Sequence, residues 1–194
     1  MNIDSNKNLE LFHAPAPNTG MELTTVFEIA KKKKLSLWLD GKNLHEPDNC
    51  HTLAEFLKNR RKDANKILVE FPSGSYMNQK LREGIEELKK MECNISYYVP
   101  TEAAKKCSEA LASGIEFKKE KSCQLLKTEI DSVKDSRLFT DISFDYSGIR
   151  AIEKIEAAKK FTWNTRNITP EQYKYLKPGL FQMVIFRNND PNDL

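Results

Sequence analysis

The chain has 194 residues, of which 39% are hydrophobic and 30% charged, a composition typical of one globular domain with a sizeable core. Its formal net charge of +3 is small and spread along the chain, so the composition argues against a nucleic-acid partner. No apolar run reaches the roughly 18 residues that span a bilayer, so no transmembrane segment is expected. The first ten residues are polar and show no signal peptide, so a cytoplasmic location is the default expectation, while the compartment and the oligomeric state stay unassigned.

Short apolar runs alternate with segments of helical periodicity along the whole chain. The predicted strands are Met1–Asp4, Leu9–His13, Leu35–Asp40, Ile67–Phe71, Asn94–Val99, Asp141–Tyr146, Phe161–Asn164 and Gln182–Phe186. The predicted helices are Leu23–Lys34, Thr52–Asn65, Asn78–Lys90, Thr101–Ala112, Phe117–Val133, Gly148–Lys159 and Pro170–Leu176. Several strands are continuous apolar runs, as expected of parallel strands buried on both faces. The alternation therefore predicts an α/β fold with right-handed crossovers.

Two architectures fit this order, a (β/α)8 barrel incomplete at its N-terminal end and a doubly wound sheet. The sequence contains neither Gly-x-Gly-x-x-Gly nor Gly-x-x-x-x-Gly-Lys-Ser/Thr, and it has seven glycines in all. The nucleotide-binding members of the doubly wound class depend on such glycine-rich turns. The barrel is therefore favoured, as a single domain over residues 1–194.

The basic run Lys31–Lys34 and the cysteines each allow two interpretations. Four lysines at the end of a predicted helix complement its dipole, and the alternative is a membrane or anion patch. No pair of cysteines has the C-x-x-C spacing of metal and redox motifs. Four scattered, reduced thiols are the favoured interpretation, with disulfides as the alternative in an exported protein. The cysteines are Cys50, Cys93, Cys107 and Cys123.

Polar side chains follow two of the predicted strands. His13 ends one strand, and Asp40 and Lys42 lie at the end of another. Active sites of α/β barrels are built at the C-terminal ends of the strands. A histidine can exchange protons near neutral pH, a carboxylate can bind a hard divalent cation, and an ammonium can meet a phosphate oxygen. The alternative is an ordinary strand-end histidine beside a structural Asp–Lys pair.

Other polar or aromatic residues occupy similar positions. Asn2 and Asp4 lie two apart on the first predicted strand, and Asp4 is a further candidate oxygen ligand. Glu70 and Trp163 end later strands, where each either lines a substrate pocket or fills the barrel mouth without a role in catalysis. His51 precedes a predicted helix, so a capping or solvent-exposed role is expected for it.

Five motifs, read in order, resemble those of the glycerophosphodiester phosphodiesterase family, within the phospholipase-C-like phosphodiesterase barrels. They are NID at Asn2–Asp4, LFHAP at Leu11–Pro15, WLDGK at Trp38–Lys42, FTWNTR at Phe161–Arg166 and GLFQMVIFRNNDP at Gly179–Pro191. The resemblance implies a (β/α)8 barrel that hydrolyses a small glycerophosphodiester or phospholipid-type phosphodiester.

The resemblance also implies roles for individual residues. A divalent cation, Ca²⁺ or Mg²⁺, would be held by Asp4 and Asp40, with Asn2 in a third ligand position. His13 would protonate the leaving alcohol, and Lys42 would neutralise charge on the phosphoryl oxygens. Glu70 and Trp163 would contact the substrate.

Three of the sequence's departures from the family's pattern affect expected catalytic or metal-binding positions. The family's first strand, which ends in His-Arg-Gly and carries one catalytic histidine, would precede Met1. Asn2 stands where a metal-binding glutamate is expected, and Ala14 stands where an aspartate follows the second histidine. The changes at Asn2 and Ala14 favour an alternative in which the barrel is a non-catalytic binding or scaffold module. A third interpretation is an unrelated α/β enzyme, in which His13, Asp40 and Lys42 do not converge.

Overall fold

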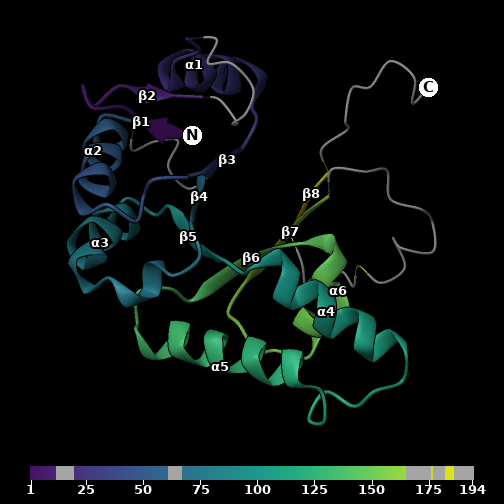
Figure 1. The fold of residues 1–194 in the computed structure, drawn as a ribbon. Coiled ribbons are helices and arrows are strands. Elements are labelled where there is room, and N and C mark those ends of the chain that lie inside the picture. Colours follow the sequence, from purple (N-terminus) through teal and green to yellow (C-terminus); the bar gives the residue numbers. More distant parts are fainter. Residues whose placement is uncertain (12–19, 61–66, 165–175, 177–181, 186–194) are drawn as a thin grey trace. The chain divides into compact units, whose positions relative to one another are not determined.

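The computed structural model describes residues 1–11, 20–60, 67–164, 176 and 182–185, the last four as backbone only (Figure 1). The chain divides into two compact units. The first comprises Met1–Tyr97 with Ser136–Phe139, and the second comprises Tyr98–Asp135 with Thr140–Leu194. Both units combine helices with parallel strands, so the predicted α/β class is confirmed. The single domain over residues 1–194 stays a prediction.

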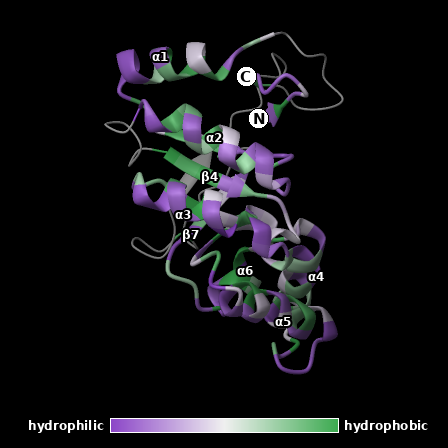
Figure 2. Cartoon of the chain, turned by 90° about the vertical axis from the view of Figure 1, so that its left-hand side faces the viewer, coloured by the Kyte–Doolittle hydropathy of each residue, from purple (hydrophilic) through white to green (hydrophobic). Residues whose placement is uncertain are grey.

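The first unit contains a parallel sheet with an apolar core on one face and a mixture of polar and apolar side chains on the other. Its strands are β3 (Leu37–Asp40), β4 (Ile67–Phe71) and β5 (Asn94–Tyr98). Side chains alternate between the two faces of a strand, so Leu39, Val69 and Ile95, which are paired across the sheet and buried, share one face. The other face carries Asp40 and Glu70 in register, and β4 is mostly hydrophobic (Figure 2).

Helix α1 (Leu23–Lys33) ends where the sequence predicts a helix end. Lys31, Lys32 and Lys33 occupy its last turn, where cations are favourable near the negative end of the helix dipole. Lys34 caps the helix in the left-handed conformation, with φ of 56°. Its backbone N–H donates to helix carbonyl groups, as in many helix C-caps.

Helix α2 (Pro47–Lys58) begins five residues before the predicted start at Thr52. Pro47 occupies the first helical turn, where backbone N–H groups have no partner within the helix, so the missing N–H of proline has no cost. Asp48 follows in the same turn, where a negative charge is favourable near the positive end of the helix dipole. The prediction that His51 lies before a helix is therefore wrong, because His51 is inside α2. Residues 61–65 of the predicted helix lie outside the described residues.

Helix α3 (Arg82–Lys90) packs against α2 and follows two short 3₁₀ turns, η2 (Ser75–Met77) and η3 (Gln79–Leu81). The two helices meet closely at Gly84. A methyl group at Gly84 would lie 2.6 Å from Sγ of Cys50 and 3.2 Å from its Cβ. A glycine is therefore needed at this contact, which sets the spacing of α2 and α3.

A short antiparallel ribbon opens the first unit. It pairs β1 (Asn2–Ile3) with β2 (Leu9–Glu10). Both strands are shorter than the sequence predicts, and the predicted end of the second at His13 lies outside the described residues.

The second unit contains the parallel strands β6 (Asp141–Asp145), β7 (Lys160–Asn164) and β8 (Gln182–Ile185). These match the predicted strands to within one residue at each end. In this unit, Asp145 and Trp163 are partners across β6 and β7.

The helices of the second unit are α4 (Thr101–Ala112), α5 (Lys121–Asp135) and α6 (Ile149–Glu153), with a 3₁₀ turn η4 (Tyr146–Gly148) before α6. Helix α5 starts four residues later than predicted, because the Glu120 carboxylate accepts hydrogen bonds from N–H and Oγ of Ser122 at 3.1 and 3.0 Å. Helix α6 ends six residues before the predicted end at Lys159. Of the predicted helix Pro170–Leu176, residues 170–175 lie outside the described residues.

A disulfide joins Cys107 on α4 to Cys123 on α5. The expectation of four reduced thiols is therefore wrong for this pair. Cys50 and Cys93 are free and buried. Burial, with a smaller contribution from the nearby Glu87 carboxylate, raises the pKa of the Cys50 thiol to about 12, and burial raises that of Cys93 to about 11.

The free thiols are expected to be nearly inert while the chain is folded. A thiolate is the reactive species, so at pH 8 Cys93 should react with a disulfide reagent more than about 100-fold, and Cys50 more than about 1,000-fold, more slowly than free cysteine. Titration after denaturation without reductant should count two thiols, and titration after reduction should count four. Fast reaction of either thiol in the native protein would contradict the buried positions.

Lys160 on β7 is a buried lysine whose removal should stabilise the second unit. Its Nζ donates to the Ile152 carbonyl at 3.1 Å. Burial lowers the pKa of Lys160, an effect that the Glu153 carboxylate opposes. The N–H of Ile155 also donates to the Ile152 carbonyl, at 3.1 Å, so this carbonyl keeps a partner if the ammonium is lost.

Lys160→Met is therefore expected to raise the free energy of unfolding at pH 7 by about 1 kcal/mol. Because the pKa is lower in the folded state, the unfolded chain binds more protons between that pKa and 10.5. The stability of the wild-type protein should accordingly rise with pH in this window, and the advantage of Lys160→Met should shrink. Urea denaturation of both proteins from pH 7 to pH 10.5 measures this difference, and a growing advantage at high pH would contradict it.

Candidate functional site

The C-terminal end of β3 carries an acid and a base in direct contact. Asp40 is the last residue of the strand, and Nζ of Lys42 lies 2.5 Å from its Oδ2. Both side chains are partly exposed to solvent, at 40% and 47%. Gly41 makes the tight turn between them, because a Cβ there would collide with the Leu44 side chain and lie 3.2 Å from the carbonyl oxygen of Glu70. The structure therefore brings into contact the two residues that the sequence places at the end of this strand.

Glu70 brings a second carboxylate to the same end of the sheet. It is the partner of Asp40 across the parallel strands β3 and β4, and its exposed fraction is only 4%. The Gly41 N–H donates to the carbonyl oxygen of Glu70 at 3.0 Å, which fixes the turn after β3 against β4. Two acidic positions thus lie side by side where parallel strands end.

The ribbon β1–β2 is fastened beside this strand end by Asn43. The Asn43 side chain accepts from the Ile3 N–H at 3.1 Å and donates to the Ile3 carbonyl at 2.7 Å. In addition, the Lys42 N–H donates to the carbonyl of Met1 at 3.0 Å. Asn2 therefore lies on a strand held against the Asp40–Lys42 segment. The sequence reasoning missed Asn43, whose only signal is a polar side chain that follows the strand end.

Asp4 uses its carboxylate within its own turn. Its Oδ1 accepts from the N–H groups of Asn6 and Asn8 at 2.8 and 2.7 Å, and its Oδ2 accepts from Nδ2 of Asn8 at 2.9 Å. These hydrogen bonds lower the pKa of Asp4, and the bond from the Asn8 side chain has the largest effect. The carboxylate is thus ionised and held by the loop, and its role as a cation ligand stays a prediction.

Trp163 belongs to the second unit, where it stacks on Tyr98. The ring centroids lie 6.5 Å apart, and the rings are inclined by 17°. The Tyr98 hydroxyl forms a hydrogen bond with Oγ1 of Thr101 at 2.6 Å, which fixes the ring. The pair forms an aromatic surface next to Asp145, the strand partner of Trp163. His13, the remaining predicted residue, lies outside the described residues.

A group of three metal-type ligands lies elsewhere in the first unit, on α2 and α3. Within the described part of the chain, ligand atoms of His51, Glu55 and Glu87 all lie within 4.8 Å of one another, whereas Asp4, Asp40 and Glu70 do not form such a group. The sequence reasoning missed this cluster. Its signal is the four-residue spacing of His51 and Glu55, which indicates one helix face once the helix is known to begin at Pro47.

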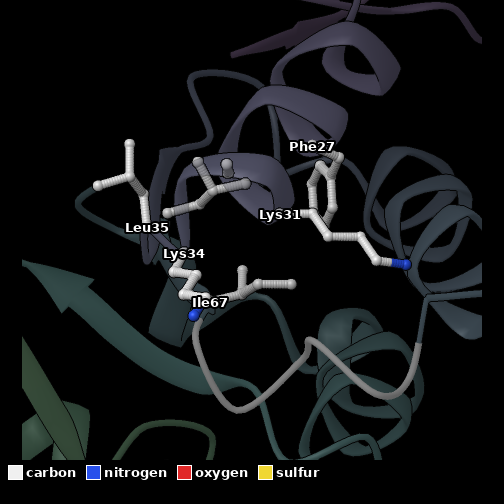
Figure 3. A pocket seen from close by; sticks show the side chains of 7 residues that line it. Phe27, Lys31, Lys34, Leu35 and Ile67 are labelled. Carbon is white, nitrogen blue, oxygen red and sulfur yellow. The ribbon is translucent and has the colours of Figure 1, made fainter.

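A hollow of about 100 Å³ lies at the opposite end of the sheet from Asp40 (Figure 3). Leu37 and Ile67, the first residues of β3 and β4, line it together with α1. The Lys31 and Lys34 side chains border its apolar wall (Figure 3). The hollow is therefore not part of the site predicted at the C-terminal strand ends.

Comparisons with protein-family models, with curated proteins and with solved structures find no match for this chain. Of the helices in the described ranges, none has both the length and the apolar character needed to cross a membrane. The residues of the site are therefore the basis for a functional assignment.

Proposed function

We propose that this chain is a phosphodiesterase-like protein that binds a glycerophosphodiester or phospholipid-type phosphodiester at the C-terminal ends of β3 and β4. One observation carries the proposal: Asp40 and Glu70 occupy partner positions at these strand ends, and Lys42 is paired with Asp40 at 2.5 Å. Strand C-termini are the common location of active sites in α/β proteins. Carboxylates and an ammonium are the groups that handle a phosphate with a divalent cation.

The carboxylates fit a hard divalent cation such as Ca²⁺ or Mg²⁺. Asp40 and Glu70 supply oxygen ligands from adjacent strands, and the anchored ribbon offers Asn2 and Asp4 as further oxygen ligands. A bound cation would supply positive charge to the phosphodiester and acidify a coordinated hydroxyl. Cation binding requires the Lys42 ammonium to move away from Asp40, and both side chains are exposed enough to do so.

The remaining residues act on the substrate directly. Lys42, released from Asp40, neutralises the charge that grows on the phosphoryl oxygens. His13 donates a proton to the leaving alcohol. Glu70 acts as a ligand of the cation beside Asp40, and the substrate contact of Trp163, which belongs to the second unit, stays a prediction.

The (β/α)8 barrel is part of the same proposal. In the first unit, Asp40, Glu70 and Ser96 lie in register on one sheet face, and each directly follows a buried apolar residue of its strand, as at the end of a barrel strand that lines a site. In the second unit, Ser143 and Asp145 alternate with the buried Ile142 and Phe144 on β6 in the same way.

A non-catalytic binding module is the second candidate. Asn2 and Ala14 replace acidic residues of the family pattern, and the Asp4 carboxylate is engaged in its own turn. Losing an acid–base group costs about 10²–10⁴-fold in rate, which would leave binding without measurable turnover. The two candidates share the ligand and differ in hydrolysis.

The test measures binding and hydrolysis of glycerophosphocholine in the presence of Ca²⁺ or Mg²⁺, with Lys42→Met as the variant. Loss of the ammonium should weaken binding on the order of tenfold, since a charge-assisted bond to phosphate is lost. Lys80→Met, at an exposed lysine of the first unit, is the matched control and should change nothing. Binding with hydrolysis supports the enzyme, binding alone supports the module, and equal affinity in Lys42→Met would contradict both.

A further inference from the structure

The exposed side of the α2–α3 pair carries a ligand set that the proposed phosphodiester site does not use. His51 and Glu55 lie one turn apart on α2, so they share a helix face. Glu87 belongs to α3. Helix α3 lies beside α2 (Figure 1). We propose that His51, Glu55 and Glu87 form a binding site for a zinc-type divalent transition-metal ion.

The distances fit such an ion. Nδ1 of His51 lies 3.2 Å from Oε2 of Glu87. Two ligands of tetrahedral zinc, each about 2.0–2.1 Å from the metal, lie roughly 3.3 Å apart. A ligand atom of Glu55 is within 4.8 Å of the other two, so rotation of this exposed side chain completes the set. One imidazole with two carboxylates is a ligand set that zinc accepts.

The backbone holds two of the three ligands in place without a metal. Gly84 lies one turn before Glu87 on α3 and contacts Cys50, the residue next to His51 on α2. This close approach brings the two helices together at the level of the ligands.

Space for the ion and its water is present. A hollow of about 180 Å³ lies between the helices, and Glu55 and Glu87 are among the residues that line it. Three protein ligands leave one position of a four-coordinate zinc ion open. The hollow offers that position to a water molecule or a small anion, and Lys58 and Lys90 line the same hollow.

Lys58 competes with a metal for Glu55. Its Nζ lies 3.0 Å from Oε1 of Glu55, and both side chains are exposed. A metal ion must displace this ammonium, so the lysine weakens binding. Removing the lysine should therefore tighten the site, an effect that a nonspecific surface interaction would not show.

The test is calorimetric titration of the untagged full chain with Zn²⁺, together with its melting temperature. We expect one-to-one binding that raises the melting temperature, because the ion joins α2 to α3. His51→Ala and Glu87→Gln should each weaken binding on the order of tenfold or more, since each removes one of three protein ligands. Lys58→Met should strengthen binding several-fold.

Two matched variants complete the experiment. His45→Ala removes an exposed histidine outside the cluster, and Asp40→Asn removes the acid of the proposed phosphodiester site; both should bind Zn²⁺ like the wild type. The ligands are at the surface, so circular dichroism should show unchanged folding in all variants. Absence of saturable binding, or equal affinity in His51→Ala and Glu87→Gln, would overturn the proposal. Neither result depends on whether the phosphodiester site functions.

Discussion

Removing the Cys107–Cys123 disulfide is expected to lower the free energy of unfolding of the second unit by about 3 kcal/mol. The bond joins α4 to α5 across 16 residues of sequence. Without it, the unfolded chain regains the entropy of an open loop, and a loop of about this length is worth roughly 3 kcal/mol. Since small domains are stable by only about 5–15 kcal/mol, the loss is a large share of the total.

The measurement is urea denaturation of the Cys107→Ser/Cys123→Ser double variant, followed by the fluorescence of Trp163 in a Trp38→Phe background. Trp163 lies on β7 in the second unit, so its signal reports this unit. Dithiothreitol should lower the stability of the Trp38→Phe protein with its disulfide intact (the parent) by the same amount, and it should leave the stability of the double variant unchanged. Equal stability of the oxidised parent and the double variant would show that the disulfide does not stabilise the fold.

Substitution of Gly84 by alanine should separate α2 from α3 and cost about 1 kcal/mol net. The added methyl group would lie 2.6 Å from Sγ of Cys50, so one helix must shift. Overfilling a packed contact typically costs about 1–3 kcal/mol, and the gain from a better helix former, about 1 kcal/mol, offsets only part of it. Displacement of α3 would also move Glu87 away from His51, so Zn²⁺ binding should weaken in the same variant.

A double-mutant cycle with Cys50→Ala isolates this contact. Cys50→Ala removes the sulfur that the new methyl group would meet, so in that background Gly84→Ala should keep only its gain in helix propensity and stabilise the protein by about 1 kcal/mol. The coupling between the two substitutions is then about 2 kcal/mol in favour of the double variant. Glu83→Ala, at an exposed position of α3, serves as the control for helix propensity. A coupling near zero would mean that the helices do not meet at Gly84.

Elements whose sequence shows a continuous apolar run or a clear helical period could be predicted from the sequence. The strand Ile67–Phe71 and the helix Thr101–Ala112 have the predicted bounds. The first is a short apolar run whose residues are all buried, and the second has a clear helical period and begins directly after Pro100. In both, the local pattern and the burial in the structure agree, so no distant contact changes the outcome.

Other features depend on contacts that a sequence does not display. The start of α2 at Pro47 was missed because the apolar period begins later, although a proline at the first turn is a known helix signal. Similarly, cysteine spacing does not reveal pairing, since Cys107 and Cys123 come together only when α4 packs on α5.

The candidate site shows the same division. The Asp40–Lys42 contact follows from their spacing around one strand end, and the structure brings them to 2.5 Å. The pairing of Asp40 with Glu70 requires the register of β3 and β4, which their sequences alone do not fix. Likewise, Glu87 joins His51 and Glu55 only because Gly84 lets α3 approach α2.

The most direct test of the proposed function is a calorimetric titration of the chain and of Asp40→Asn with Ca²⁺ and Mg²⁺. Asp145→Asn, at the end of a strand in the second unit, and His51→Ala, in the proposed zinc site, serve as controls. The proposal predicts saturable one-to-one binding that is lost in Asp40→Asn and kept in both controls. Absence of binding to the folded wild-type chain, or equal affinity in Asp40→Asn, would contradict a cation-dependent phosphodiester site at the end of β3.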